Sequence, residues 1–424
     1  MLGLDEVHAQ NLRTIPDADR FRFHELLHAD EIVYLEEYDI DAKLDEARRI
    51  LDKADGTIDA VIGHWDFPVT SMVPILCREY SLISPTLTSV LTCTHKYWSR
   101  LEQQKAAPEA TPKFCAVDPF DDRAPDRIEL DYPFWIKPVK GYASILGFYI
   151  AGREDLDKAL AQARQEIRRL GEPFTRFLER VERPREIHEV DGNHMIAEEI
   201  IGGRELAPEG YVQNGQFHAH GMIDMVRGRN RKSFQRYQYP SRMPRRVQER
   251  AVEISRKVLQ QIGFDNGCFN IEFFWDEGRD RLSIIEINPR ASQSHADLFR
   301  KVDGMSNHDV AVHVALGEDP RFERGGGRFR HAAKCLYRRY DRDDAVVTHV
   351  PTQKELQKLR RRQPETVATI DLKKGMRLSE LKDQDPYSYV LAELSIGAMS
   401  RKELLAKFRE AQELLPFEFE PVND

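Results

Sequence analysis

The feature that most constrains this chain is an expected antiparallel hairpin at residues 270–290. Its first arm reads Asn-Ile-Glu-Phe-Phe-Trp, and its second arm reads Leu-Ser-Ile-Ile-Glu-Ile-Asn-Pro-Arg. Polar residues 276–281 separate the arms, and two strand-like runs joined by such a short segment typically pair with each other. We take the turn to be centred on Arg279. The hairpin then has a definite register.

This register brings five polar residues to one face. With the turn centred in this way, Glu272 pairs with Glu286, and Asn270 pairs with Asn288. Side chains alternate along a strand, so these four residues share their face with Arg290. We therefore expect all five to converge.

Two carboxylates that face each other across a strand pair repel. Burial of Glu272 and Glu286 is expected because their neighbours are apolar. These neighbours are Ile271, Phe273, Phe274, Ile284, Ile285 and Ile287. A hard divalent cation would offset the repulsion, and magnesium usually binds one or two carboxylates together with substrate phosphates. The alternative is an exposed hairpin whose carboxylates face water.

Length and charge bound the class of ligand. The chain has 424 residues, which suggests roughly three domains. Its 63 basic and 71 acidic residues give a net charge of −8, so we expect neither nucleic acid nor an anionic membrane as a partner. No apolar run approaches the roughly 20 residues that span a bilayer, and no signal-peptide pattern opens the sequence. We expect a cytoplasmic protein that binds small molecules, with its five cysteines reduced and structural.

The first region of the chain reaches about Leu91. Residues 42–53 form an amphipathic segment, residues 58–63 resemble a strand, and residues 70–80 favour a helix. This order predicts a small parallel sheet, with His64–Asp66 on a loop after a strand, where open α/β sheets tend to bind ligands. The alternative is a loop that only caps a helix.

The remaining elements follow from alternation, helical periodicity and turn residues. Strands are expected at 113–117, 133–139, 147–151 and 195–201, and helices at 95–105, 154–170 and 246–262. Asn214-Gly215 predicts a tight hairpin turn between 211–213 and 216–219. The third region begins near Gly325–Gly327, with β-like stretches at 345–349 and 366–372. Its basic run at 360–362 is interpreted as the solvated end of a helix.

Several segments, taken in order, resemble the ATP-grasp superfamily over about Leu91 to Pro320. The run 285–290, which follows Glu272 by a hairpin, is similar to the family's metal and phosphate segment. Other matching segments are His95-Lys96, the stretch 132–138 around Lys137, the loop 140–147 with Gly141 and Ser144, and the hinge 195–205.

The resemblance implies ATP as a substrate and one or two Mg²⁺ ions, with Mn²⁺ as the alternative ion. The implied nucleotide-binding residues are Lys96, Lys137, Gly141, Ser144, Glu198, Glu199, Ile201 and Glu205. The implied metal ligands are Glu272, Glu286 and Asn288, and the implied catalytic residues are Arg290 and His295. The lysines would supply point charges for phosphates, and a hinge strand would offer its backbone to adenine.

The implied fold is α/β (α+β). Residues 1–92 would form a Rossmann-like pre-ATP-grasp domain and residues 93–322 the ATP-grasp domain, with a lid at about 115–195. Residues 323–424 would form a small β-rich C-terminal domain. Large ligases of this family are often dimers, which implies a homodimer by analogy.

The resemblance implies a ligase that activates a carboxylate as an acyl phosphate and couples it to an amine. Biotin carboxylases share the overall layout, but they carry a glutamate base directly before the histidine, where this chain has Ser294 before His295. The phosphate loop lacks their near-continuous glycines, and no Met-Lys-Met site is present. These differences favour an amino-acid or dipeptide-type ligase. A non-catalytic nucleotide-binding module is the third alternative.

Specificity is less visible in the sequence. Residues 233–240 and the preceding Arg227, Arg229 and Arg231 are interpreted either as an acceptor pocket, since guanidinium binds carboxylates in a bidentate way, or as a basic surface loop. His218 and His220 alternate in a predicted strand, which is typical of ordinary surface residues more than of a metal pair.

Overall fold

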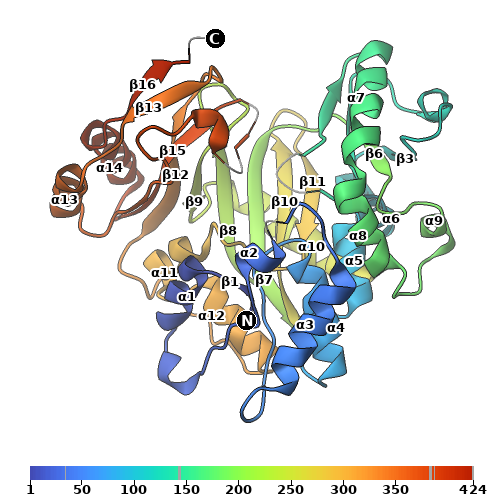
Figure 1. Cartoon of the computed structure of the whole chain (residues 1–424), viewed down its shortest axis with the longest axis horizontal. Helices are drawn as coiled ribbons and strands as arrows, with labels where there is room; N and C mark the ends of the chain where they lie inside the picture. Colours follow the sequence, from blue (N-terminus) through green and yellow to red (C-terminus); the bar gives the residue numbers. More distant parts are fainter. Residues whose placement is uncertain (34, 142–144, 382–383, 386, 423–424) are drawn as a thin grey trace. The chain divides into compact units, whose positions relative to one another are not determined.

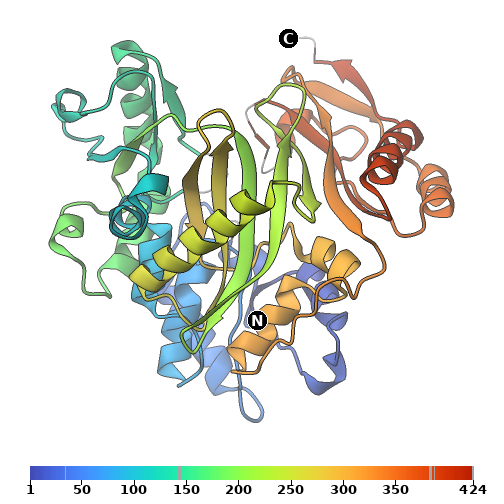
Figure 2. The ribbon, with the colours of Figure 1, turned by 180° about the vertical axis from the view of Figure 1, so that it is seen from behind.

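The computed structural model describes residues 1–33, 35–141, 145–381, 384–385 and 387–422. The chain forms two compact units (Figures 1 and 2). The first comprises Met1–His220, Pro244–Gln293 and Asn307–Arg321, and the second comprises Gly221–Met243, Ser294–Ser306 and Phe322–Asp424. The division into three domains stays a prediction. Within the described ranges, no helix is long and apolar enough to cross a membrane.

The start of the first unit is mostly helical. The short strands β1 (Leu2–Leu4) and β2 (Leu27–His28) pair in parallel. The expected strand at 58–63 is wrong, because this segment is extended without forming a ladder. Its Ile62 carbonyl accepts one hydrogen bond from the Leu2 N–H at 2.9 Å. The helical elements are α1 (Glu6–Arg13), η1 (Ala18–Arg20), α2 (Ala29–Ile32), α3 (Ile40–Asp52), α4 (Val69–Glu79), α5 (Leu87–Thr94), α6 (Lys96–Ala106) and η2 (Pro108–Ala110).

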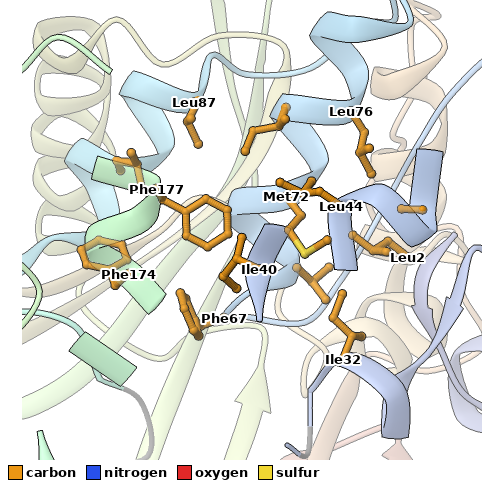
Figure 3. Packing of buried hydrophobic residues seen from close by; sticks show 14 of the residues in the cluster. Leu2, Ile32, Ile40, Leu44, Phe67, Met72, Leu76, Leu87, Phe174 and Phe177 are labelled. Carbon is orange, nitrogen blue, oxygen red and sulfur yellow. The ribbon is translucent and has the colours of Figure 1, made fainter. Parts of the chain in front are cut away.

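A hydrophobic core holds these helices together (Figure 3). Helix α8 (Arg168–Leu178) contributes Phe174 and Phe177, whose rings lie 6.2 and 5.9 Å from that of Phe67. Edge-on aromatic packing of this kind adds to the burial of apolar area. Phe67 follows the loop that carries Asp66, so this core fixes the position of the loop.

A four-stranded antiparallel sheet of order β3-β6-β4-β5 follows. The sequence predicts one helix at 154–170, whereas the structure has α7 (Arg153–Glu166) and α8, separated at Ile167. Helix α8 extends beyond the predicted end because its buried Phe174 and Phe177 anchor it to the first core. The other elements are β3 (Phe114–Val117), η3 (Ala124–Arg127), β4 (Phe134–Pro138), β5 (Phe148–Ile150), α9 (Arg185–His188) and β6 (Met195–Glu199).

Three antiparallel strands of a second, longer sheet lie in the first unit in the order β11-β10-β7. These strands are β7 (Arg204–Gln213), β10 (Gly267–Asp276) and β11 (Arg281–Asn288). Helix α10 (Arg245–Ile262), drawn in yellow, crosses one face of these strands (Figure 2). Its Arg246 guanidinium lies 5.7 Å from the ring of Trp275, which shares a face with Ile271 and Phe273. The opposite face therefore carries Asn270 and Glu272.

The predicted turn at Asn214-Gly215 is confirmed, since both residues have positive φ and join β7 to β8 (Gln216–Arg227). Helix α12 (Asn307–Ala315) completes the first unit.

In the second unit, β9, β12, β15 and β14 are neighbours in that order, and β13 pairs with β16. Its elements are β9 (Phe234–Tyr239), α11 (Ala296–Asp303), β12 (His331–Arg339), β13 (Ala345–His349), α13 (Gln353–Arg362), β14 (Val367–Thr369), η4 (Leu378–Glu380), β15 (Tyr389–Ala398), α14 (Arg401–Leu414) and β16 (Glu418–Pro421). The basic run at 360–362 is the exposed end of α13, as expected.

Candidate active site

The hairpin has the predicted pairs. Asn270 lies opposite Asn288, and Glu272 lies opposite Glu286. The expected centre of the turn is wrong, because Asp276 pairs with Arg281 and the centre falls between Gly278 and Arg279. A bulge beside Glu272 inserts Ile285 as an extra residue in the second strand. The two differences cancel, so the four polar residues still share one face.

Strand β7 adds two carboxylates to this face. Asn270 pairs with Glu209, and Phe274 pairs with Glu205, so both glutamates lie on the same side as Glu272. Glu205 is among the predicted nucleotide residues, whereas Glu209 is missed by the sequence reasoning. The Glu209 carboxylate accepts hydrogen bonds from Ser292 N and Asn307 Nδ2. The alternation of glutamates along β7 was the signal that could have found it.

The clustered carboxylates change the proton affinity of Glu272. Burial, followed by the charges of Glu286 and Glu205, raises its pKa well above the usual range, while Arg290 opposes the change. Asn288 Nδ2 lies 3.5 Å from both Asn270 Oδ1 and Glu272 Oε1. The side-chain oxygens gathered here could bind a hard cation, and such a cation would offset the repulsion among the carboxylates.

The described part of the chain contains no group of three or more His, Cys, Asp or Glu side chains arranged to hold a metal by themselves. The pair Glu272 and Glu286 matches the other mode of binding, in which magnesium takes one or two carboxylates and completes its shell with phosphates and water. The residues present fit Mg²⁺ in that mode.

Lys96 connects the metal face to the glycine turn. It is the first residue of α6, and its Nζ donates to the Gly141 carbonyl at 2.8 Å. The same Nζ lies 3.9 Å from Glu286 Oε2. Burial lowers the pKa of Lys96 to about 8, and Lys137 and Lys140 contribute to the lowering. Ser144, predicted in the same turn, lies outside the described residues.

A buried ion-pair network joins three parts of the site. Glu198 accepts from Arg100 Nε and from Lys137 Nζ, both at 2.7 Å. Arg100 Nη2 also donates to the Ile285 carbonyl at 2.8 Å, which is the bulge of the metal strand. Burial alone would raise the pKa of Glu198, but the two cations outweigh it and lower the pKa to about 2. Arg100 is not among the residues predicted from the sequence, because a helical arginine carries no local signal of burial.

We expect this network to lose its stabilising effect in acid. The pKa of Glu198 falls from an ordinary 4.5 to about 2 in the folded protein. Such a group stabilises the fold above its unfolded pKa, and the effect is lost as pH falls through the folded value. The free energy of unfolding of the wild type should therefore fall more steeply than that of Glu198→Gln between pH 4.5 and about 2. Urea unfolding across this window measures both, and parallel profiles would contradict the prediction.

The predicted hinge lies where β6 ends. Glu199 N–H donates to the Lys113 carbonyl at 2.9 Å, and its carboxylate accepts from Arg281 Nη2 at 2.7 Å. Two residues further on, the backbone of Ile201 has no hydrogen-bond partner among the described residues. Ile201 therefore offers a free N–H and carbonyl, which are the groups that an adenine edge requires.

Asp66 lies between two cations. Its Oδ1 accepts from Lys140 Nζ at 2.7 Å, and its Oδ2 accepts from Arg290 Nη2 at 3.3 Å. Burial alone would raise the pKa of Asp66, but the neighbouring cations hold it well below the usual range. Lys140 also lies 5.5 Å from the centre of the Phe67 ring. The sequence singled out this loop and the phosphate loop that begins at Lys140, but it did not predict the contact between Asp66 and Lys140.

His295 belongs to the second unit, and its predicted catalytic role stays a prediction. It is buried there, with its ring 5.6 Å from that of Tyr237. In the same unit the Arg227 guanidinium lies 4.7 Å from the Phe234 ring, so it has an aromatic partner. In the first unit, His218 stacks on Tyr211 at 4.7 Å.

Comparisons with known proteins bear on this geometry. Residues 130–296 match the family model described as the ATP-grasp domain. A stretch of 65 residues is 37% identical to the carbamoyl phosphate synthase large chain of Paenarthrobacter aurescens (strain TC1). That stretch covers 15% of this chain and only 6% of the relative.

Two solved structures are similar to most of the chain. The L-amino acid ligase from Bacillus licheniformis has a TM-score of 0.68 at 16% identity, over 90% of this chain and 85% of the ligase. The biotin carboxylase domain of the 2-oxoglutarate carboxylase from Hydrogenobacter thermophilus, in complex with MgADP and bicarbonate, has a TM-score of 0.59 at 16% identity, over 89% and 78% of the two chains. These likenesses confirm the predicted α/β fold as that of ATP-grasp proteins.

Proposed function

From the premise that residues 130–296 are an ATP-grasp domain, we propose that this protein is an ATP-dependent ligase. It would activate a carboxylate as an acyl phosphate, couple it to an amine and release ADP and phosphate. One observation supports the proposal most directly. Lysine side chains of the first unit lie near the paired carboxylates Glu272 and Glu286 of the hairpin. The positive charges of Lys137 and Lys140 lower the pKa of Lys96. The Lys96 Nζ lies 3.9 Å from the Glu286 carboxylate. Such a mixture suits a phosphate chain that is partly neutralised by a divalent ion.

The nucleotide would lie along the elements that support these residues. The free backbone of Ile201 and the neighbouring Glu198-Glu199 strand end would receive adenine, and Glu205 would accept from ribose hydroxyls. Lys96 and Lys137 would bind phosphate oxygens as point charges. Gly141, whose carbonyl already contacts Lys96, and Ser144 would belong to the turn over the phosphates.

Glu272, Glu286 and Asn288 would hold one or two Mg²⁺ ions, with Mn²⁺ as the alternative. When bound, the ion supplies neutralisation of phosphate charge. Binding requires the carboxylates in their charged form, and the raised pKa of Glu272 means that the metal-free site tends to hold a proton.

The chemistry then needs positioning and charge stabilisation. A carboxylate oxygen attacks the γ-phosphorus, the new O–P bond forms, and the bond to the β,γ-bridging oxygen breaks to release ADP. An amine next attacks the acyl carbon, the C–N bond forms, and the C–O bond to phosphate breaks while the amine proton passes to solvent. Arg290 is proposed to stabilise the transferred phosphoryl group and then the tetrahedral oxyanion, because its guanidinium faces Asp66 and interacts with Glu272. His295 is proposed as a further catalytic residue.

The alternative is a carboxylase component related to biotin carboxylases. The similarity in fold to the Hydrogenobacter domain supports it, but Ser294 before His295 cannot serve as the base that a glutamate provides. A non-catalytic nucleotide-binding module is a weaker alternative, since a site without catalysis has no need of the opposed Glu272 and Glu286. We further propose that the protein acts in the cytoplasm as a homodimer on small molecules, without nucleic acid or membrane partners.

Phosphate release tests the proposal. The protein is incubated with ATP, Mg²⁺ and pairs drawn from a broad panel of amino acids, and phosphate is measured with and without each acceptor. We expect release to require Mg²⁺ and to depend on both members of at least one pair, with an amide product by mass spectrometry. Release that depends on bicarbonate and biotin would favour the carboxylase. ATP binding without release from any pair would contradict a ligase.

A further inference from the structure

A cavity lies beside Arg290 inside the first unit. It has a volume of about 80 Å³, and its walls come from the extended segment before Asp66, helices α4, α5 and α12, and the start of β10. Most of the lining is apolar. Its apolar residues include Val61, Val73, Ile83, Val90, Cys268 and Val314.

Two polar residues of the lining bear on the place where the metal strand ends. Arg290 and His64 both border the cavity. His64 is 1% exposed, and its Nε2 has no hydrogen-bond partner among the described residues, as is also true of Arg290 Nε. Gln293 Nε2 donates a hydrogen bond to the His64 carbonyl at 2.9 Å. This bond fixes the loop against the segment that follows the metal strand. Buried polar atoms without partners cost free energy and often mark the place where a ligand binds.

Arg290 therefore borders both the charged site and the apolar cavity. On one side its Nη2 contacts Asp66, and its charge reaches Glu272. On the other side it lines the cavity together with Pro289 and Ala291. A molecule whose carboxylate lies at this guanidinium has an apolar space next to it for the rest of its structure.

We propose that this cavity binds the apolar tail of the carboxylate substrate, so that the acid is one with an aliphatic side chain. The inference rests on the proposed function, which places the reacting carboxylate at Arg290. An apolar lining selects against charged or polar tails, because their groups would lose water without gaining partners. Each methylene that enters such a space should improve binding by about fourfold until the cavity is full.

Binding without ATP tests the inference separately from the ligase reaction. The probes are unbranched carboxylates from acetate to hexanoate, titrated into the full chain by calorimetry. We expect affinity to rise with tail length and the corresponding alcohols to bind more weakly, since they lack the charge for Arg290. Equal affinity along the series, or no binding of any acid, would overturn the inference.

Two variants at one lining position give opposite expectations. Val73→Phe fills the cavity and should abolish the gain with tail length, whereas Val73→Ala enlarges it and should shift the preference toward longer tails. Val367→Ala, at an exposed valine of β14, is the matched control and should behave as wild type. If Val73→Phe does not fold, as judged by circular dichroism, Val73→Ala alone decides. An unchanged length preference in the folded variants would refute the site.

The outcomes separate the two proposals. Length-dependent binding that responds to Val73, without phosphate release from any pair, would support the cavity and contradict the ligase. Phosphate release that is equally efficient with short and long acids, and insensitive to Val73, would support the ligase and contradict the cavity.

Discussion

Glu286→Gln should lower ATP-dependent phosphate release by about 10²-fold or more, because it removes a charge that is preorganised for the phosphoryl transfer. The amide has nearly the same shape as the carboxylate but is neutral, and it leaves Glu272 alone to face a metal ion. The free energy of unfolding of the metal-free variant should equal or exceed that of the wild type, because the repulsion between the two opposed carboxylates disappears. Phosphate release, calorimetric Mg²⁺ titration and urea unfolding measure the three effects.

The matched control for this variant is Glu277→Gln, which makes the same chemical change in the exposed turn of the same hairpin. It should retain wild-type release and metal affinity. Wild-type turnover by Glu286→Gln would refute the metal assignment. A clear loss of stability in the metal-free variant would show instead that Glu286 has a structural role.

Arg100→Met should destabilise the protein by about 3–5 kcal/mol, the range expected when one partner of a buried ion pair is removed. The Arg100 side chain is 2% exposed, and its loss leaves Glu198, at 6%, with a single cation. The Ile285 carbonyl at the bulge also loses its donor. Urea unfolding measures the change, and the slope with urea should stay constant if the fold is preserved.

Arg153→Met is the control, because this arginine forms exposed ion pairs with Asp126 and Asp157, and it should change stability little. The double variant Arg100→Met with Glu198→Gln should be less destabilised than the sum of the single changes, because the uncompensated buried charge is gone. Strict additivity, or a stable Arg100→Met, would show that the network does not hold these elements together.

Local patterns predicted the hairpin better than they predicted its details. The pairing of Glu272 with Glu286 came from alternation and a polar turn, and it held although the turn centre and the bulge at Ile285 were both missed. Bulges depend on what contacts the strand, and here the Ile285 carbonyl receives Arg100 from a distant helix. A sequence pattern within one hairpin contains no information about that contact.

The extended segment at 58–63 shows a local pattern that predicted the wrong structure. Its apolar alternation resembles a strand, yet a strand needs a partner with matching length, and the neighbouring β1 has only three residues. Among the residues that the structure describes, one backbone hydrogen bond, from Leu2 N–H to the Ile62 carbonyl, joins the segment to β1. The helix predicted to end at residue 170 is likewise followed by α8, which ends at Leu178. Its Phe174 and Phe177 pack into a core built from residues about a hundred positions away in the chain.

The sequence by itself determined the chemistry of the candidate site, namely lysines, opposed glutamates and an asparagine on segments with short-range periodicity. Alternation and turn geometry act between neighbours in the chain, so they can be read locally. Only the tertiary structure decided which charges meet. Asp66 contacts Lys140 and Arg290, and Arg100 joins Glu198 to the bulge, across long separations in sequence. Burial and Coulomb interactions depend on distance in space, and the fold alone sets that distance.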